Sequence, residues 1–116
     1  MKPKAKSIEV HKNDLPDRLD LGDIVAVDTE TRGLKLGRDR LCLVQVSAGD
    51  GNCHLVQFSE GGVDAPNLKA LITDKAVTKI FHYARFDMAA IQTYLGVWCE
   101  PVYCTKIASI LVRTYT

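Results

Sequence analysis

The alternation of hydrophobic and polar positions divides the chain into a strand-rich first half and a second half with helical periodicity. Apolar runs over about 23–30, 41–47 and 53–58 are bounded by turn residues, such as those of 48–52. Short apolar runs between turn signals predict strands, and short connections predict that neighbouring strands pair antiparallel. We therefore expect a three-strand antiparallel meander, preceded by an arm or strand near Ile8-Glu9-Val10.

The pattern changes after Glu60-Gly61-Gly62, where apolar residues begin to recur at three- and four-residue steps. The spacing predicts, in order, a helix beginning at Pro66, a strand over 77–82, a helix over 84–95, a short strand near 102–103 and a helix over 106–113. A meander followed by β-α-β-α indicates an α/β fold with a mixed sheet and helices packed against it.

The organisation is that of one domain, because a chain of 116 residues buries a modest core and no repeat or linker interrupts it. We expect residues 1–20 to form an N-terminal arm or strand and residues 21–116 to form the first part of a domain. The chain ends at Thr114-Tyr115-Thr116, directly after an amphipathic segment. We therefore expect the domain to be incomplete at the C-terminus.

Charge and cysteine usage narrow the class of protein. The net charge of +1 gives no global basic field, so any nucleic-acid binding relies on local patches. No apolar stretch approaches the roughly 18–20 residues of a membrane helix, and the basic N-terminus lacks the apolar segment of a signal peptide. The four cysteines form no Cys-x-x-Cys pair. These features predict a cytoplasmic protein with reduced thiols and no membrane partner.

Two carboxylates supply the first chemical signal. Asp28 and Glu30 follow the apolar run Ile24-Val25-Ala26-Val27, which is typical of a strand buried on both faces. Side chains two residues apart on a strand point to the same face, so these carboxylates lie side by side where the strand leaves the core. Their repulsion and the cost of an interior location favour a cation between them. Oxygen-only ligands suit Mg²⁺ or Mn²⁺ rather than zinc.

The second signal is the sequence His82-Tyr83-Ala84-Arg85-Phe86-Asp87, at the junction of a predicted strand and a helix. Open α/β sheets bind ligands beyond the carboxyl ends of their strands, which makes this junction a candidate site. Asp87 also falls in the first helical turn, where an anion gains up to about 1 kcal/mol from the helix dipole. Helix stabilisation is therefore the alternative interpretation of Asp87 when it is taken without Asp28 and Glu30.

The strings VDTETRGL and HYARFD together resemble the first two motifs of the ribonuclease D branch of the DEDD (DEDDy-type) 3′–5′ exonucleases. The intervening LCLVQVS and the later CTKIAS are similar to the same branch, and within it the chain resembles the nano-RNase C group. The resemblance runs from about residue 23 to the end of the chain. It implies a ribonuclease H-like fold and two-metal hydrolysis of short RNA from the 3′ end to nucleoside 5′-monophosphates.

Metal ligands carry over from the matching motif positions. The resemblance implies that Asp28, Glu30 and Asp87 are catalytic and bind two Mg²⁺ or Mn²⁺ ions, with Asp28 bridging both. The third motif of the branch is a tyrosine followed four residues later by an aspartate, and it lies well downstream of the CTKIAS region. This chain has no such pair after CTKIAS, because position i+4 from Tyr115 lies beyond the end. We therefore expect the enzyme to be a longer protein and the 116-residue form to be weak or inactive.

Substrate contacts are expected beside the two motifs. By resemblance, Leu34 matches the residue that wedges against the terminal base, and His82 and Phe86 match positions that line the substrate pocket. Arg32 and Arg85 adjoin the motif carboxylates. For these two arginines, contact with phosphate and exposure on a solvated loop are equally good interpretations.

The remaining basic and metal-binding side chains show no pattern that requires a site. Arg38 and Arg40 are expected in a solvated loop, with phosphate contact as the alternative. His11 and His54 lack any ligand spacing and are interpreted as surface or structural residues. No usual spacing of zinc ligands is matched by the candidate set Cys53, His54, Cys99 and Cys104.

The expected partners are short RNA or other single-stranded nucleic acid with a free 3′ end, and the sequence leaves open whether the chain forms a homo-oligomer. The alternative is a non-catalytic nucleic-acid-binding or assembly module with the same fold, and a downstream Tyr-x-x-x-Asp would distinguish the enzyme from it. A phosphohydrolase of free nucleotides is a third hypothesis, tested by comparing a dinucleotide with a nucleoside triphosphate as substrates.

Overall fold

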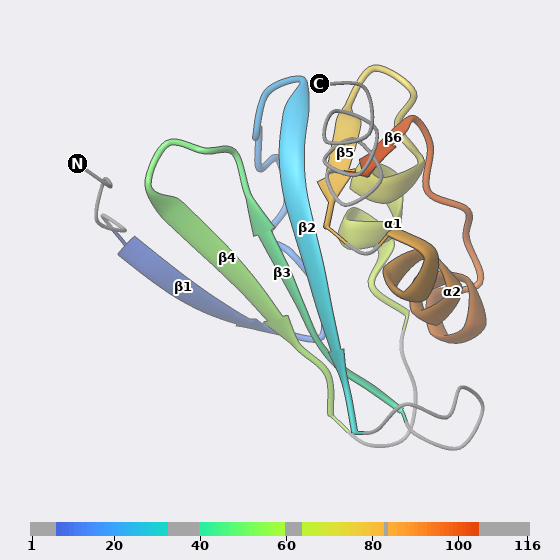
Figure 1. Ribbon diagram of the computed structural model, residues 1–116. Coiled ribbons are helices and arrows are strands. Elements are labelled where there is room, and N and C mark those ends of the chain that lie inside the picture. Colours follow the sequence, from blue (N-terminus) through green and yellow to red (C-terminus); the bar gives the residue numbers. More distant parts are fainter. Residues whose placement is uncertain (1–6, 33–39, 60–63, 83, 105–116) are drawn as a thin grey trace, which may run out of the picture.

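A computed structural model describes residues 7–32, 40–59, 64–82 and 84–104 (Figure 1). Its elements are β1 (Ser7–Lys12), β2 (Ile24–Thr31), β3 (Leu41–Ser47), β4 (Asn52–Gln57), α1 (Pro66–Thr73), β5 (Thr78–Phe81), α2 (Ala84–Leu95) and β6 (Val102–Cys104). The predicted strands and the first two predicted helices are all present, within two residues of their expected bounds. The helix expected over 106–113 lies outside the described residues.

The six strands form one mixed sheet in the order β1-β4-β3-β2-β5-β6. β2, β3 and β4 pair antiparallel, which confirms the predicted meander. β5 pairs parallel with β2, and β6 pairs parallel with β5, so the following β-α-β unit extends the sheet on the other side of β2. β1 closes the opposite edge by pairing parallel with β4. The α/β class and mixed sheet are as expected.

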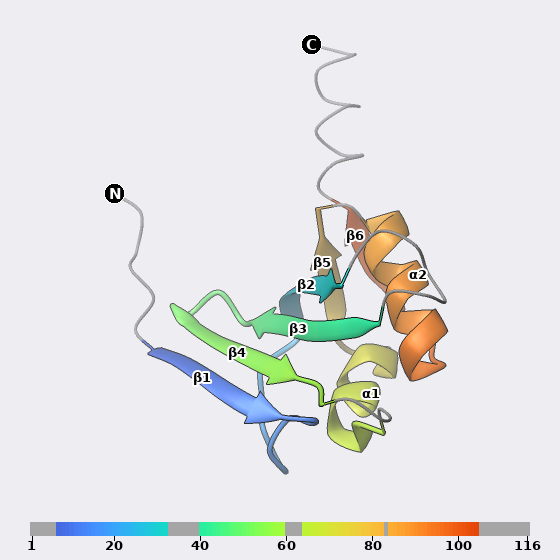
Figure 2. The same ribbon diagram turned by 90° about the horizontal axis from the view of Figure 1, so that it is seen from below.

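Both helices lie on one face of this sheet (Figure 2). Consequently β2 alternates in burial: Val25 and Val27 are buried, whereas Ala26 and Ile24 are exposed, Ile24 to 52%. The prediction that this strand is buried on both faces was therefore wrong for the described structure. Among the described residues no helix covers the second face of β2. The side chains on that face, such as Ile24, are nevertheless apolar, so the sequence of β2 resembles that of a strand covered on both faces.

The core fills the space between the sheet and the two helices. Its fully buried side chains come from every central strand and from both helices, namely Val25, Val44, Val46, Val56, Leu68, Ile72, Phe81 and Ile91. Lys79 is also fully buried, because it faces this core from β5, opposite Val25. Its ammonium group donates hydrogen bonds to the carbonyls of Asp74 at 2.5 Å and Glu100 at 3.0 Å.

The N-terminus of α1 is capped by a residue from a distant part of the chain. Ala65 occupies the N-cap position with a left-handed φ of 47° and provides no side-chain hydrogen bond. The carboxylate of Asp14, in the segment after β1, accepts hydrogen bonds from the backbone N–H groups of Asn67 at 3.0 Å and Leu68 at 2.9 Å. These bonds satisfy donors that a helix leaves unpaired at its start, so they tie the N-terminal segment to α1.

Within the described ranges, no helix has the length and hydrophobicity needed to cross a membrane. None of the four cysteines is joined in a disulfide.

Candidate active site

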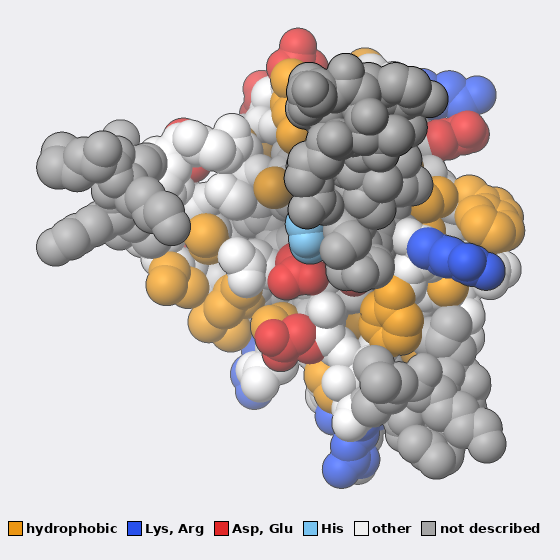
Figure 3. Space-filling model, in the orientation of Figure 1, with side chains coloured by type: hydrophobic (Ala, Val, Ile, Leu, Met, Phe, Trp, Pro, Cys, Tyr) orange, Lys and Arg blue, Asp and Glu red, His pale blue; other side chains and the backbone are white. Residues whose placement is uncertain are grey.

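A pocket of about 650 Å³ opens where β2 and β5 stop pairing. The parallel pairing of these strands ends at Ala26 and Ile80, so β2 continues without β5 beside it. Figure 3 shows acidic side chains and a histidine gathered near the middle of this face of the molecule. The pocket is lined by Ala26, Val27, Asp28, Thr29, Gln45, Ser47, Ile80, Phe81, His82, Phe86 and Asp87.

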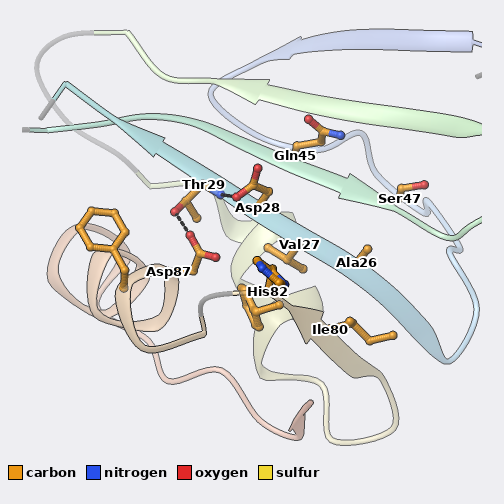
Figure 4. A pocket seen from close by; sticks show the side chains of 11 residues that line it. Ala26, Val27, Asp28, Thr29, Gln45, Ser47, Ile80, His82 and Asp87 are labelled. Atoms are coloured by element: carbon orange, nitrogen blue, oxygen red, sulfur yellow. Dashed lines mark hydrogen bonds between the residues drawn. The ribbon is translucent and has the colours of Figure 1, made fainter. Parts of the chain in front are cut away.

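Asp28 and Asp87 enter this pocket from different elements (Figure 4). Asp28 is exposed on β2, and one of its carboxylate oxygens accepts a hydrogen bond from the backbone N–H of Thr29 at 3.0 Å. Asp87 belongs to the first turn of α2 and is only 6% exposed. The strand and the helix thus bring together two acidic side chains that are 59 residues apart in the sequence.

The Asp87 carboxylate is held in place by Thr29, whose hydroxyl donates a hydrogen bond to it. Burial raises the pKa of Asp87 above its ordinary value of 3.8, and the nearby negative charge of Asp28 raises it further. The hydrogen bonds from Thr29 act in the opposite direction and favour the ionised form. Asp87 is therefore a carboxylate whose charge lacks full compensation within the described residues.

Glu30 lies two residues beyond Asp28 on the same face of β2 and is exposed. It pairs with Leu43 of β3, just before an irregularity in the register between Glu30 and Thr31. It is not among the residues that line the pocket. The expectation that Asp28 and Glu30 share an interior location was therefore wrong, because no described residue covers their face of the sheet. The buried carboxylate of the site is that of Asp87.

Some of the residues expected to contact substrate line the pocket, and others lie outside it. His82, exposed at the end of β5, and Phe86, half-buried on α2, both line the pocket. Arg85 is exposed on α2 and Arg32 is exposed after β2, and neither is in the lining. Leu34 lies outside the described residues.

Arg40 differs from its expected place in a solvated loop. It is half-buried, and its guanidinium donates a hydrogen bond to the carbonyl of Phe58 at 3.0 Å. This contact is structural, since it joins the start of β3 to the end of β4. Arg38 lies outside the described residues.

Sequence analysis missed Thr29, Gln45 and Ser47 as parts of the site. Gln45 and Ser47 occupy alternate positions of β3 on the pocket side. Two polar residues at every second position of an otherwise apolar strand indicate a face that is not core, and this signal was available. The contact of Thr29 with Asp87 was not, because it depends on where α2 packs.

The donor set fits a hard divalent cation. Asp28, Glu30 and Asp87 offer carboxylate oxygens only, the ligands that Mg²⁺ and Mn²⁺ prefer over zinc. A cation beside Asp28 and Asp87 would offset the desolvation and the mutual repulsion that raise the pKa of Asp87. The donor atoms of these two residues and their shared pocket therefore fit the chemistry of an Mg²⁺ or Mn²⁺ site.

Comparison with known proteins finds relatives that are nucleases. Residues 7–115 match a family described as 3′–5′ exonuclease. Ribonuclease D of Acidiphilium cryptum is 33% identical over 97 residues, which cover 84% of this chain and 24% of that protein. The solved structure of Brucella melitensis NrnC bound to pGG is 51% identical with a TM-score of 0.89, covering 95% of this chain and 54% of that chain. NrnC has also been solved with bound Mg²⁺, at the same identity and TM-score.

A more distant structure has the same fold. Escherichia coli RNase D, described as an exoribonuclease involved in structured RNA processing, is 25% identical with a TM-score of 0.62. The match covers 74% of this chain and 22% of that one. The chain thus spans about half the length of NrnC and about a quarter of the ribonuclease D proteins that it matches.

Proposed function

Because the chain belongs to the 3′–5′ exonuclease family, within its ribonuclease D and NrnC branch, we propose that it acts on short RNA as a divalent-metal-dependent 3′–5′ exoribonuclease. The observation that carries the proposal is the meeting of Asp28 and Asp87 in one pocket. The relatives support it, since NrnC has been solved both bound to pGG and with Mg²⁺.

The proposed reaction hydrolyses the last phosphodiester and releases a nucleoside 5′-monophosphate. When bound, two divalent cations would stabilise the negative charge on the attacking and leaving oxygens and lower the pKa of bound water. We assign their protein ligands to Asp28, Glu30 and Asp87. Thr29 orients the Asp87 carboxylate, and its hydrogen bond opposes the rise in the pKa of Asp87 that burial causes.

Two residues of the lining are assigned to the terminal nucleotide. Phe86 offers an aromatic ring for stacking on a base, a contact of about 1–3 kcal/mol that does not select among bases. His82, exposed beside the carboxylates, is assigned to a phosphate. Leu34 keeps its expected role as a wedge against the terminal base. Arg32 and Arg85 lie outside the pocket and are assigned to phosphates of the RNA further from its 3′ end.

We further propose that the 116-residue chain turns over slowly compared with NrnC, because each cation takes about six oxygens and residues 1–116 contain no third motif to add a carboxylate. Residues 21–116 then form the N-terminal part of the exonuclease domain, preceded by the arm that contains β1. We also assign the chain to the cytoplasm, where its four cysteines would remain reduced.

A ladder of 5′-labelled oligoribonucleotides tests the proposal, incubated with this chain, with its Asp28→Ala variant and with NrnC as the positive control. We expect shortening one nucleotide at a time in Mn²⁺, at a rate below that of NrnC, and no shortening with Asp28→Ala or without metal. Binding of the ladder without any shortening would favour the non-catalytic module. Hydrolysis of a nucleoside triphosphate in preference to a dinucleotide would favour the phosphohydrolase.

A further inference from the structure

Glu9, His11 and His54 bring their side chains together at the edge of the sheet formed by β1 and β4. In the parallel register of these strands Glu9 lies opposite His54, and His11 follows Glu9 by two residues. All three side chains therefore project from the same face. Their facing atoms, Glu9 Oε2, His11 Nε2 and His54 Nδ1, form a triangle with edges of 3.1, 3.5 and 3.6 Å.

This cluster is separate from the pocket that contains Asp28. His54 pairs with Val46 of β3, a core residue, whereas Gln45 of the pocket lining pairs with Leu55. Side chains of successive residues on a strand point to opposite faces, so the cluster projects from the face of the sheet opposite Gln45. Asp28 pairs with Gln45 and shares its face. An ion at one position cannot be held by ligands of the other.

The triangle has the dimensions of three corners of a tetrahedral zinc site. Zinc binds imidazole nitrogen at about 2.0–2.1 Å and carboxylate oxygen at about 2.0–2.2 Å, which places tetrahedral ligands about 3.3–3.6 Å from one another. Two of the three edges fall in that range, and the nitrogen-to-nitrogen edge is slightly shorter because the two imidazoles share a hydrogen bond. We propose that Glu9, His11 and His54 bind Zn²⁺ or a similar ion, such as Co²⁺ or Ni²⁺.

Burial gives the site a closed side and an open side. The His54 side chain is 9% exposed and that of Glu9 is 56% exposed. The two histidines thus anchor the ion against the sheet, while Glu9 closes over it from solvent and a water molecule completes the tetrahedron. Two nitrogen donors also set the selectivity, since imidazole suits zinc and its neighbours, whereas Mg²⁺ prefers oxygen.

The ion would join an edge strand to the sheet. β1 pairs only with β4 among the described strands, so β1 depends on one ladder of hydrogen bonds. Two ligands from β1 and one from β4 add a second connection between these strands. Because metal that binds only the folded chain stabilises it, Zn²⁺ is expected to raise the unfolding temperature.

Zinc binding is measured on an untagged chain in the presence of excess Mg²⁺, so that hard oxygen sites are occupied by Mg²⁺. Calorimetric titration is expected to give one Zn²⁺ per chain, and Co²⁺ is expected to give the intense visible bands of tetrahedral coordination. His11→Ala and Glu9→Gln should lower Zn²⁺ affinity at least about tenfold and abolish these bands. His82→Ala, which removes the third histidine of the chain, and Asp28→Asn should leave both signals unchanged.

Equal Zn²⁺ affinity of His11→Ala and His82→Ala would overturn the proposal. So would loss of Zn²⁺ binding in Asp28→Asn together with its retention in His11→Ala, because that result would place the ion among the carboxylates. The decisive variants change the two more exposed members of the cluster, and circular dichroism confirms that each is folded. Binding is read without any nuclease assay, so this proposal and the proposed function stand or fail separately.

Discussion

The hydroxyl of Thr29 donates a hydrogen bond to the carboxylate of Asp87 across 58 residues of sequence. This bond joins the end of β2 to the first turn of α2, so the strand that presents Asp28 also positions the second carboxylate. The site is consequently built from the packing of one strand against one helix. Its metal ligands are expected to depend on a residue that is not itself a ligand.

Thr29→Val tests this positioning role with a side chain of the same shape. Because the hydroxyl is lost while strand propensity is kept, we expect an intact fold and Mn²⁺ affinity lower by about tenfold or more. Thr29→Ser keeps the hydroxyl and should restore most of the affinity. Titration of free Mn²⁺ by electron paramagnetic resonance measures both variants, and equal affinities for the two would contradict the role assigned to the hydroxyl.

Asp87→Asn is expected to have opposite effects on stability and on metal binding. The metal-free variant should be more stable than the parent at neutral pH, by up to about 1 kcal/mol, because it removes a buried charge. Mn²⁺ should raise the unfolding temperature of the parent but not that of the variant. Loss of stability in the metal-free variant would contradict the destabilising effect assigned to the buried charge of Asp87.

The pH dependence of that difference follows from the raised pKa of Asp87. Below the unfolded value near 3.8 the carboxyl is protonated in both states, so parent and Asp87→Asn should be equally stable there. As the pH rises to the folded pKa, the unfolded state loses its proton first and the parent loses stability relative to the variant. Above the folded pKa the difference is constant. Thermal unfolding of both proteins from about pH 4 to pH 7 measures it.

Lys79→Met should destabilise the fold by about 1–3 kcal/mol, because the charged ammonium group donates hydrogen bonds to the carbonyls of Asp74 and Glu100. The Asp74 carbonyl keeps its second hydrogen bond, from the backbone N–H of Val77 at 3.1 Å, which limits the loss. Burial lowers the pKa of Lys79, which shows that burying its charged form is unfavourable. Replacing Lys79 with an uncharged side chain therefore offsets part of this loss. Lys69→Met is the control. Lys69 forms an ion pair with the exposed Asp64 at 3.6 Å, and loss of such a surface pair should change stability by less than about 0.5 kcal/mol. Urea unfolding distinguishes the two.

Asp14→Ala should cost about 0.5–2 kcal/mol by removing the cap of α1. Asp14→Asn keeps one acceptor oxygen and should recover part of this loss. Chemical denaturation of the two variants measures the difference, and unchanged stability in Asp14→Ala would show that water satisfies these N–H groups equally well.

Local patterns along the chain were sufficient for most of the fold. The apolar spacing of 84–95 predicted α2 with its observed bounds, and the turns between the apolar runs predicted the antiparallel pairing of β2, β3 and β4. The family matches confirm the ribonuclease H-like fold and the ribonuclease D branch that the motifs indicated. Helix bounds and hairpin pairing depend on residues that are close in the sequence, so a single sequence is enough to predict them.

The errors concern contacts between distant segments. The apolar run of β2 could not show that one of its faces is open, because that depends on which helices reach it. His11 and His54 had no recognisable spacing, since their approach follows from the parallel pairing of β1 with β4 across 43 residues. The contact of Thr29 with Asp87 depends on the packing of α2 against β2, which no local pattern displays.

The most direct test of the account is anomalous diffraction from crystals soaked in Mn²⁺. We expect density for Mn²⁺ in the pocket, within ligand distance of the Asp28 and Asp87 carboxylates and with Glu30 turned toward it, and none there in Asp28→Ala. Carboxylates that point apart with no ion density among them, in crystals whose pocket is open to solvent, would contradict the assignment of a metal-dependent nuclease site.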